Sequence, residues 1–138
     1  MVFIDANIPM YAGGGASPYK DPCRKILTWI AEGRLVAVTD AEVFQEILYR
    51  YYHIRRVDTG RVVFDSLKTV VERVLPVSAD CVFLARELGL RYGDVNPRDL
   101  LHLAVMIRND IRSIVSVDGD FDAIAEVDRI DPLTMAEP

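Results

Sequence analysis

Apolar residues follow two different patterns along the chain. Short runs rich in Val, Ile and Leu have the length of buried strands, and they are Val2–Asp5, Leu35–Val38, Val74–Val77 and Ile114–Val117. Longer stretches repeat apolar residues at helical spacing, and they are Pro18–Glu32, a segment from Thr39 or Asp40 to about His53, Thr59–Val74, Ser78–Leu88 and Asn96–Arg108. A short helix is expected after Asp118–Asp122. Because strands alternate with helices, the pattern predicts an α/β fold with a parallel sheet.

Local signals set the expected ends of several helices. Gly33 and Gly89 each stand where a glycine commonly terminates a helix. Asn96 is a good N-cap, and Pro97 suits the first helical position that follows it. The run Gly13–Gly15 is expected to form a mobile loop near the exit of the first strand.

Composition places the chain among globular proteins. It has 138 residues, of which 51% are hydrophobic and 27% are charged, so we expect a single domain spanning residues 1–138. The two cysteines, Cys23 and Cys81, lie far apart, which favours small buried residues over a disulfide framework or a zinc site. Neither a basic leader nor an apolar run of ~20 residues is visible. We therefore expect a cytoplasmic protein without a membrane segment.

The formal net charge of −5 has the wrong sign for a protein that binds nucleic acid tightly and non-specifically. Such proteins normally contact phosphates through an excess of Lys and Arg. A cluster of metal-binding carboxylates would explain the sign, because the sequence counts their charges while a bound cation neutralises them. The charge therefore argues against a non-specific duplex binder but not against an enzyme.

Four acidic residues stand where parallel α/β sheets bind ligands, at the carboxyl ends of strands and the starts of the next helices. Asp5 ends the first strand and Asp118 the last. Taken alone, Asp99 could be a helix-capping acid, Asp118 a turn residue and Glu46 a solvated helix acid. Asp5 is harder to explain in this way, because an unpaired acid is costly to bury. Four converging carboxylates would suit Mg²⁺ or Mn²⁺ and not zinc.

At these positions the chain resembles the PIN-domain family and, within it, the small toxin-type ribonucleases of the VapC kind. Four stretches in the family's order carry the resemblance: Phe3–Ile8, Gln45–Tyr49, Pro97–Ala104 and Ser116–Phe121. It implies a three-layer α/β/α fold with a central, mostly parallel sheet. It also implies a Mg²⁺-dependent endoribonuclease, in which a metal-activated water hydrolyses RNA phosphodiesters.

The resemblance also implies roles for individual side chains. The catalytic, metal-holding carboxylates would be Asp5, Glu46, Asp99 and Asp118. Asn7 and Ser116 match positions whose side chains form hydrogen bonds within the site, and Asp120 matches an additional position that is frequently acidic. Glu42, one helical turn before Glu46, competes with it for its assignment. His102 is expected to pack or to form helix hydrogen bonds rather than to act as a general base.

The segment Tyr49–Arg56, with Arg61 beyond it, is the densest aromatic and basic stretch of the chain. Arginine can pair with RNA phosphates and tyrosine can stack on unpaired bases, which makes this segment a candidate RNA-binding surface. Alternatively, it is a helix end with packed tyrosines and solvated arginines. The resemblance offers a third interpretation, because such family members usually bind a small antitoxin protein and often form homodimers.

Two other functions remain open at this point. The early Asp and the stretch Gly119–Asp122 resemble a haloacid-dehalogenase-type phosphatase, but that chemistry needs a second Asp where the chain has Asn7. It also needs a late lysine, as does a response-regulator receiver domain, and the last lysine here is Lys68. The stronger alternative is a PIN-type fold that no longer cleaves and serves as a binding or scaffold module. The presence of all four acids weighs against it.

Overall fold

The computed structural model describes residues 1–138 and contains a five-stranded sheet. Its strands are β1 (Val2–Ile4), β2 (Ala37–Asp40), β3 (Arg73–Leu75), β4 (Ser113–Val115) and β5 (Asp128–Ile130). The order is β3-β2-β1-β4-β5, and all neighbouring strands are parallel. The central strand β1 lies between β2 and β4, so that Phe3 pairs with Val38 on one side and with Ile114 on the other.

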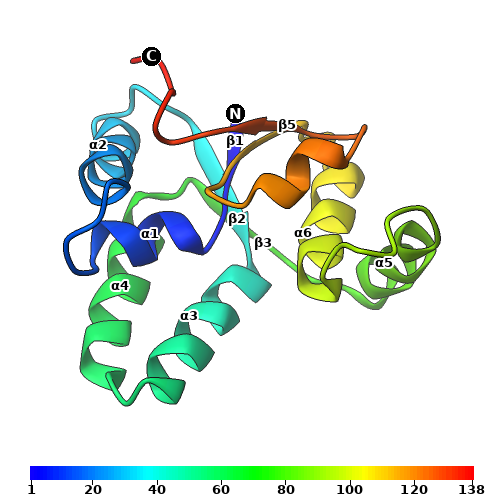
Figure 1. The fold of residues 1–138 in the computed structure, drawn as a ribbon, viewed down its shortest axis with the longest axis horizontal. Helices are drawn as coiled ribbons and strands as arrows, with labels where there is room; N and C mark the ends of the chain where they lie inside the picture. Colours follow the sequence, from blue (N-terminus) through cyan, green and yellow to red (C-terminus); the bar gives the residue numbers. More distant parts are fainter.

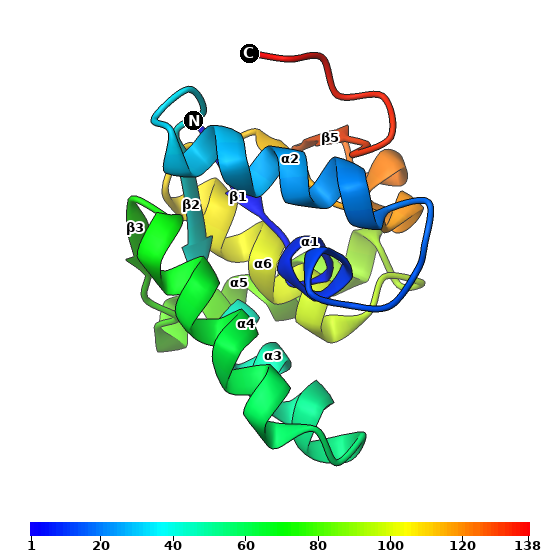
Figure 2. The ribbon, with the colours of Figure 1, turned by 90° about the vertical axis from the view of Figure 1, so that its left-hand side faces the viewer.

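Helices cover both faces of this sheet (Figure 1). They are α1 (Asn7–Ala12), α2 (Lys20–Ala31), α3 (Ala41–His53), α4 (Val57–Val70), α5 (Ala79–Arg91), α6 (Pro97–Arg108) and the 3₁₀ helix η1 (Gly119–Ala123). α1, α2 and α4 lie on one side of the sheet, and α5 and α6 lie on the other. α3 and α4 pack as a pair that extends away from the sheet (Figure 2). The predicted three-layer α/β/α architecture is confirmed.

The centre of the sheet is buried because β1 and β4 are apolar on both faces, as is usual for inner parallel strands. Phe3 and Ile114 are fully buried, as is Met106 from α6, and they belong to a continuous cluster of 32 buried apolar residues. Cys23 and Cys81 are buried and free, as predicted. No helix combines the length and the apolar character needed to cross a membrane. Because the apolar strands β1 and β4 are buried and pair in parallel, their carboxyl ends lie side by side.

The helix signals in the sequence act as predicted at several ends. The side chain of Asn96 accepts a hydrogen bond from the backbone nitrogen of Arg98 at 2.8 Å, which caps α6. Asp40 accepts one from the backbone nitrogen of Val43 at 2.9 Å and caps α3. Gly33 follows α2 with a φ of +71°, a left-handed conformation that glycine adopts without strain.

The structure differs from the sequence prediction in its smallest elements. α1 was not predicted, because it has six residues and carries Pro9 in its first turn, too little sequence for a periodic pattern. The Gly13–Gly15 loop therefore follows α1 and not β1. The edge strand β5 was missed because it is short and contains the polar residues Asp128 and Arg129. Gly89 does not end α5, which continues to Arg91.

Two helical glycines are expected to respond in opposite ways to replacement by alanine. A Cβ on Gly60 in α4 would lie 2.5 Å from the Cβ of Tyr51 in α3, so the two helices would have to separate, at a cost of about 1–3 kcal/mol. A Cβ on Gly89 would meet only Cδ1 of Leu100, at 3.4 Å, and alanine there gains up to about 1 kcal/mol of helix propensity. Chemical denaturation should show a lower free energy of unfolding for Gly60→Ala and a higher one for Gly89→Ala. A Gly60→Ala protein as stable as wild type would contradict the close packing of α3 on α4.

Candidate functional site

The four candidate carboxylates meet in one cavity at the carboxyl edge of the sheet. Its volume is about 350 Å³, and its lining includes Asp5, Glu46, Asp99 and Asp118. Asp5 directly follows β1, and Asp118 follows the neighbouring strand β4. Asp99 lies in the first turn of α6, and Glu46 lies in α3. Because adjacent parallel strands end at the same edge, acids from distant parts of the chain converge there.

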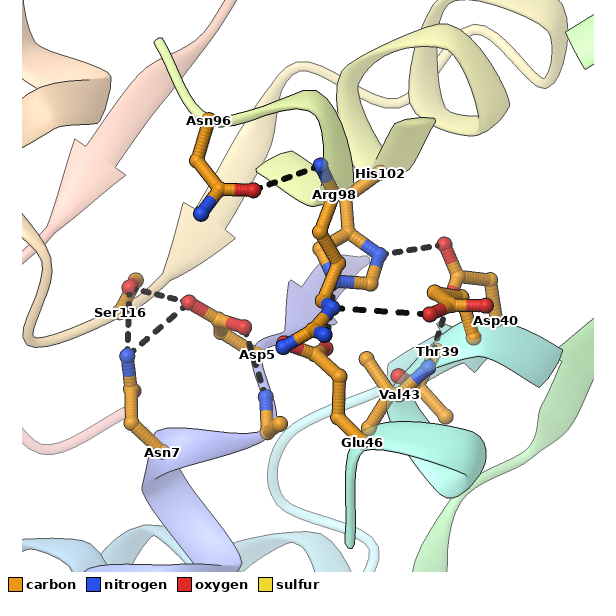
Figure 3. A network of polar contacts seen from close by, with 12 residues as sticks. Asp5, Asn7, Thr39, Asp40, Val43, Glu46, Asn96, Arg98, His102 and Ser116 are labelled. Carbon is orange, nitrogen blue, oxygen red and sulfur yellow. Dashed lines mark hydrogen bonds and ion pairs between the residues drawn. The ribbon is translucent and has the colours of Figure 1, made fainter. Parts of the chain in front are cut away.

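Hydrogen bonds fix the side chain of Asp5 (Figure 3). Its Oδ1 accepts a bond from the backbone nitrogen of Ala6 at 2.7 Å, and its Oδ2 accepts bonds from Ser116 Oγ at 2.6 Å and Asn7 Nδ2 at 3.0 Å. Ser116 Oγ in turn accepts bonds from Asn7 Nδ2 at 3.1 Å and from the backbone nitrogen of Asp118 at 3.0 Å. Asp5 is 4% exposed. Asn7 and Ser116 therefore set the direction in which its carboxylate faces the cavity.

Asp118 and Asp120 differ in their relation to the cavity. Asp118 lines it and also caps η1, because its Oδ1 accepts a hydrogen bond from the backbone nitrogen of Asp120 at 2.9 Å. The side chain of Asp120 is exposed and is not part of the cavity wall. The structure therefore brings Asp120 to the site through its backbone and not through its carboxylate.

Burial and mutual repulsion raise the pKa of two carboxyl groups in the cavity. The pKa of Asp99 rises to about 7, because burial disfavours its charged form and because the other carboxylates, Asp5 foremost, repel it. The pKa of Asp5 is raised mainly by burial, although His102 and the hydroxyl of Ser116 oppose this shift. Carboxyl groups in this condition either hold protons or attract a cation.

The cavity adjoins a buried histidine that joins two of the acids. Nδ1 of His102 lies 2.7 Å from Oδ2 of Asp40, and Nε2 lies 2.7 Å from Oε2 of Glu46 (Figure 3). His102 and Asp40 are fully buried. Burial alone would lower the pKa of His102, but the hydrogen bonds to both carboxylates raise it well above its usual value. Both ring nitrogens then donate, as they can only in the imidazolium form.

One signal in the sequence could have identified this group. Asp40 is an acid at the end of a buried strand, β2, just as Asp5 is an acid directly after β1, and both are buried. Because an unpaired buried acid is costly, Asp40 also required a partner. In the sequence, Asp40 is recognisable only as a possible helix cap, yet one of its oxygens caps α3 while the other faces His102. Of the two expectations for His102, packing agrees with the structure, because the ring is fully buried with its centroid 5.6 Å from that of Phe3. Its hydrogen-bond partners lie on β2 and α3 and not on its own helix.

The cavity that each glutamate lines, and not its contact with Arg98, distinguishes the two glutamates that compete for one assignment. The guanidinium of Arg98 lies 3.5 Å from Oε1 of Glu46 and 3.6 Å from Oε1 of Glu42, and it also lies over the ring of Tyr49. Glu46 lines the acidic cavity, whereas Glu42 lines a separate groove between α5 and α6. Glu46 is therefore the glutamate that shares a cavity with the three aspartates.

The donor chemistry of the cavity fits a hard divalent cation. Asp5, Glu46 and His102 each offer one potential ligand atom, and these atoms lie within 4.8 Å of one another. Both nitrogens of His102 are already hydrogen-bonded to carboxylates, so the donors left for a metal are carboxylate oxygens. Oxygen donors suit Mg²⁺ or Mn²⁺ rather than zinc. A cation there would also relieve the repulsion that raises the pKa of Asp99.

A second cavity, of about 780 Å³, adjoins the acidic one and shares Asn7, Met10 and Arg50 with it. Arg56 and the Gly13–Gly15 loop also line it. The arginines that form ion pairs are Arg34, Arg61, Arg86, Arg91, Arg98, Arg108, Arg112 and Arg129. Arg50 and Arg56 are not among them, so a surface with two free positive charges adjoins the acidic cavity.

Comparison with known proteins gives matches over nearly the whole chain. The family model of the PIN domain matches residues 2–127. The chain is 40% identical over 130 residues to Ribonuclease VapC13 of Mycobacterium tuberculosis, and the match covers 94% of this chain and 99% of that protein.

Solved structures with a similar fold cover the chain equally well. The structure of VapC20 from Mycobacterium tuberculosis, described as a sarcin-ricin loop cleaving toxin, has a TM-score of 0.75 at 24% identity, and the match covers 92% of this chain and 97% of that one. A chain of a toxin–antitoxin complex from Klebsiella pneumoniae has a TM-score of 0.67 at 14% identity, with coverages of 96% and 98%. The two structures are similar to this chain in fold.

Proposed function

The chain belongs to the PIN-domain family and, within it, to the VapC proteins, and we propose that it is a Mg²⁺-dependent endoribonuclease. It hydrolyses RNA phosphodiesters, and Mn²⁺ is an alternative ion for the same oxygen donors. Supporting the activity, its relative VapC13, 40% identical, is named a ribonuclease.

One observation supports the proposal more than any other: four carboxylates from four separate segments line a single cavity. Capping or solvation explains each acid alone but does not explain why they converge. Two unit charges ~4 Å apart repel by about 4 kcal/mol at an effective dielectric near 20. A fold that keeps such a cluster gains from binding a cation, because the cation offsets this repulsion.

In this proposal the metal ligands are the four carboxylates of the cavity: Asp5, Glu46, Asp99 and Asp118. Asn7 and Ser116 keep the carboxylate of Asp5 in place. When bound, the ion supplies a Lewis acid that stabilises charge on the phosphate oxygens and lowers the pKa of a water. Arg98, at the rim of the cavity, offers a guanidinium that can donate hydrogen bonds to a phosphate. The mechanism requires no covalent nucleophile from the chain.

The RNA strand is proposed to run from the acidic cavity into the adjoining one. Arg50 lines both cavities and Arg56 lines the second, and free arginines can pair with phosphates on either side of the cleaved bond. Tyr49 and Tyr52 are 54% and 73% exposed, so their rings are accessible for stacking on unpaired bases. Tyr51 is 7% exposed and packs inside. Within the aromatic and basic segment, Tyr51 therefore stabilises the fold, whereas Tyr49 and Tyr52 are accessible to RNA.

Replacing Arg50 and Arg56 together by alanine should weaken RNA binding without changing the affinity for Mg²⁺. Each phosphate contact to a single strand contributes about 0.7 to the slope of log K against log salt concentration. The double variant should therefore show a slope shallower by about 1.4, measured by fluorescence anisotropy with single-stranded RNA in an Asp99→Asn background, in which cleavage is strongly reduced. Arg24→Ala removes an exposed charge from α2 and serves as the control. An equal loss with Arg24→Ala would assign the effect to net charge and not to this surface.

The proposal extends to the partners of the chain. As the toxin of a toxin–antitoxin pair, it would bind a small antitoxin protein, which the similarity in fold to a chain of a toxin–antitoxin complex supports. A homodimer is also proposed, because α5 carries the exposed apolar side chains of Val82, Phe83 and Leu90, and clustered apolar surface commonly marks a protein interface. Both partners act in the cytoplasm in this proposal.

The most direct test of the activity uses the purified chain and single-stranded RNA. Cleavage should require Mg²⁺, stop when EDTA is added and return when Mg²⁺ is restored in excess. A PIN-type scaffold without catalysis would bind partners but show no cleavage that depends on Mg²⁺. RNA that stays intact in Mg²⁺ and in Mn²⁺ would therefore contradict the proposed enzyme in favour of the scaffold.

A further inference from the structure

A buried chain of hydrogen bonds runs from the end of β2 to the acidic cavity and consists of Asp40, His102 and Glu46 (Figure 3). We propose that Asp40 and His102 are positioning residues, which hold the carboxylate of Glu46 in the orientation in which it binds the metal. This inference rests on the proposed function, because Glu46 is one of the proposed ligands. Asp40 and His102 would then act on the metal only through Glu46.

The first link of this chain is anchored on both sides. Asp40 is the last residue of β2 and the N-cap of α3, where its Oδ1 accepts a hydrogen bond from the backbone nitrogen of Val43 at 2.9 Å. Its Oδ2 lies 2.7 Å from Nδ1 of His102. Because Asp40 is fully buried, water does not compete for either oxygen. The carboxylate therefore has one available direction, and the imidazole takes its orientation from it.

The second link joins the two helices that supply candidate metal ligands. His102 lies on α6, one turn after Asp99, while Glu46 lies on α3. The 2.7 Å contact between Nε2 of His102 and Oε2 of Glu46 thus sets the glutamate relative to the aspartate. The ring of His102 also packs against Phe3 of the central strand, with 5.6 Å between ring centroids. Strand and helix together hold the imidazole rigidly.

Glu46 needs such a partner more than the three aspartates do. A glutamate has one more rotatable bond than an aspartate, and ordering its side chain costs more conformational entropy. Its other oxygen, Oε1, lies near Arg98, at 3.5 Å, a longer contact with a side chain that is 43% exposed. The bond to His102 is short, and the imidazole is fully buried. His102 is therefore the partner that determines where the carboxylate points.

The experiment measures Mn²⁺ affinity by isothermal titration calorimetry on the full chain, together with its melting temperature in EDTA. His102→Gln should raise the Kd for Mn²⁺ by roughly 10- to 100-fold, as is typical when a partner of a metal ligand is lost. Asp40→Asn keeps the volume and the cap of α3 but loses the carboxylate, and it should raise the Kd in the same direction. In a Glu46→Gln background, His102→Gln should cause no further increase, because the ligand through which it acts is gone.

A matched control separates positioning from stability. Ser78→Ala removes the N-cap of α5, away from the cavity, and should lower the melting temperature while leaving the Kd for Mn²⁺ unchanged. If His102→Gln and Asp40→Asn behave like Ser78→Ala, the two residues are structural and the inference is wrong. If His102→Gln does not fold, Asp40→Asn alone decides: an unchanged Kd overturns the inference. If wild type itself binds no Mn²⁺, the proposed function fails, and the inference fails with it.

Discussion

Asp99→Asn should remove most of the Mg²⁺-dependent cleavage of RNA, by roughly 10²- to 10³-fold in rate, the loss typical of one charge-stabilising group in an active site. The reason is that Asp99 shares its cavity with three other acids and is a proposed ligand of the metal; burial first, and then repulsion by those acids, raises its pKa. An amide at this position keeps the shape of the side chain but removes the anionic ligand. Initial rates on single-stranded RNA at saturating Mg²⁺ measure the effect.

The same substitution should raise stability in the absence of metal. Charged Asp99 repels the other carboxylates, and the neutral amide does not, so Asp99→Asn should melt at a higher temperature than wild type in EDTA near pH 8. Asp65→Asn, an identical change at an exposed position in α4, should alter neither rate nor melting temperature. An Asp99→Asn protein that cleaves RNA as fast as wild type would refute the role of Asp99.

The stabilisation that Mg²⁺ provides should increase with pH between about pH 5 and pH 8. Asp99 has a pKa of about 7 in the folded chain, above its ordinary value of 3.8. A group whose pKa rises on folding contributes stability that is fully present below the unfolded pKa and is lost as pH rises through the folded one. The metal-free protein should therefore lose stability from this group between pH 4 and pH 7. The raised pKa of Asp5 acts in the same direction.

Mg²⁺ competes with protons for these carboxylate oxygens. It therefore stabilises the protein mainly at pH values at which the carboxyl groups are deprotonated. At a concentration 100 times the Kd, a ligand of the folded state adds about 2.7 kcal/mol of stability, and each kcal/mol raises the melting temperature of a chain of this size by roughly 3 °C. Differential scanning fluorimetry in Mg²⁺ and in EDTA measures this difference at each pH. A Mg²⁺ effect of equal size at pH 5 and pH 8 would contradict the account.

Most of the fold could be predicted from sequence, because local patterns determine it. The strand β1 is short, apolar on both faces and followed by an acid, and Asn96 caps α6 through its own side chain. The grouping of the four acids rested on the rule that the carboxyl ends of parallel strands share an edge and on the resemblance to the PIN-domain family. Elements with few residues were missed: α1 and β5 are too short for their periodicity to be recognised.

The contacts between distant side chains could not be predicted. Nothing close to His102 in the sequence indicates that its two nitrogens meet Asp40 and Glu46, because those partners come from another strand and another helix. The position of Arg98 between Glu42 and Glu46 likewise depends on how α6 packs beside α3. Sequence patterns identify which residues can carry chemistry, whereas the packing of the elements decides which of them meet.

A crystal of the chain soaked in Mn²⁺ and measured at the manganese absorption edge would show whether the clustered carboxylates hold a metal ion. We expect an anomalous peak inside the cavity, within ligand distance of oxygens from Asp5 and Asp99. A peak that lies only elsewhere, or a cavity without manganese at a concentration that supports cleavage, would contradict the proposed metal site.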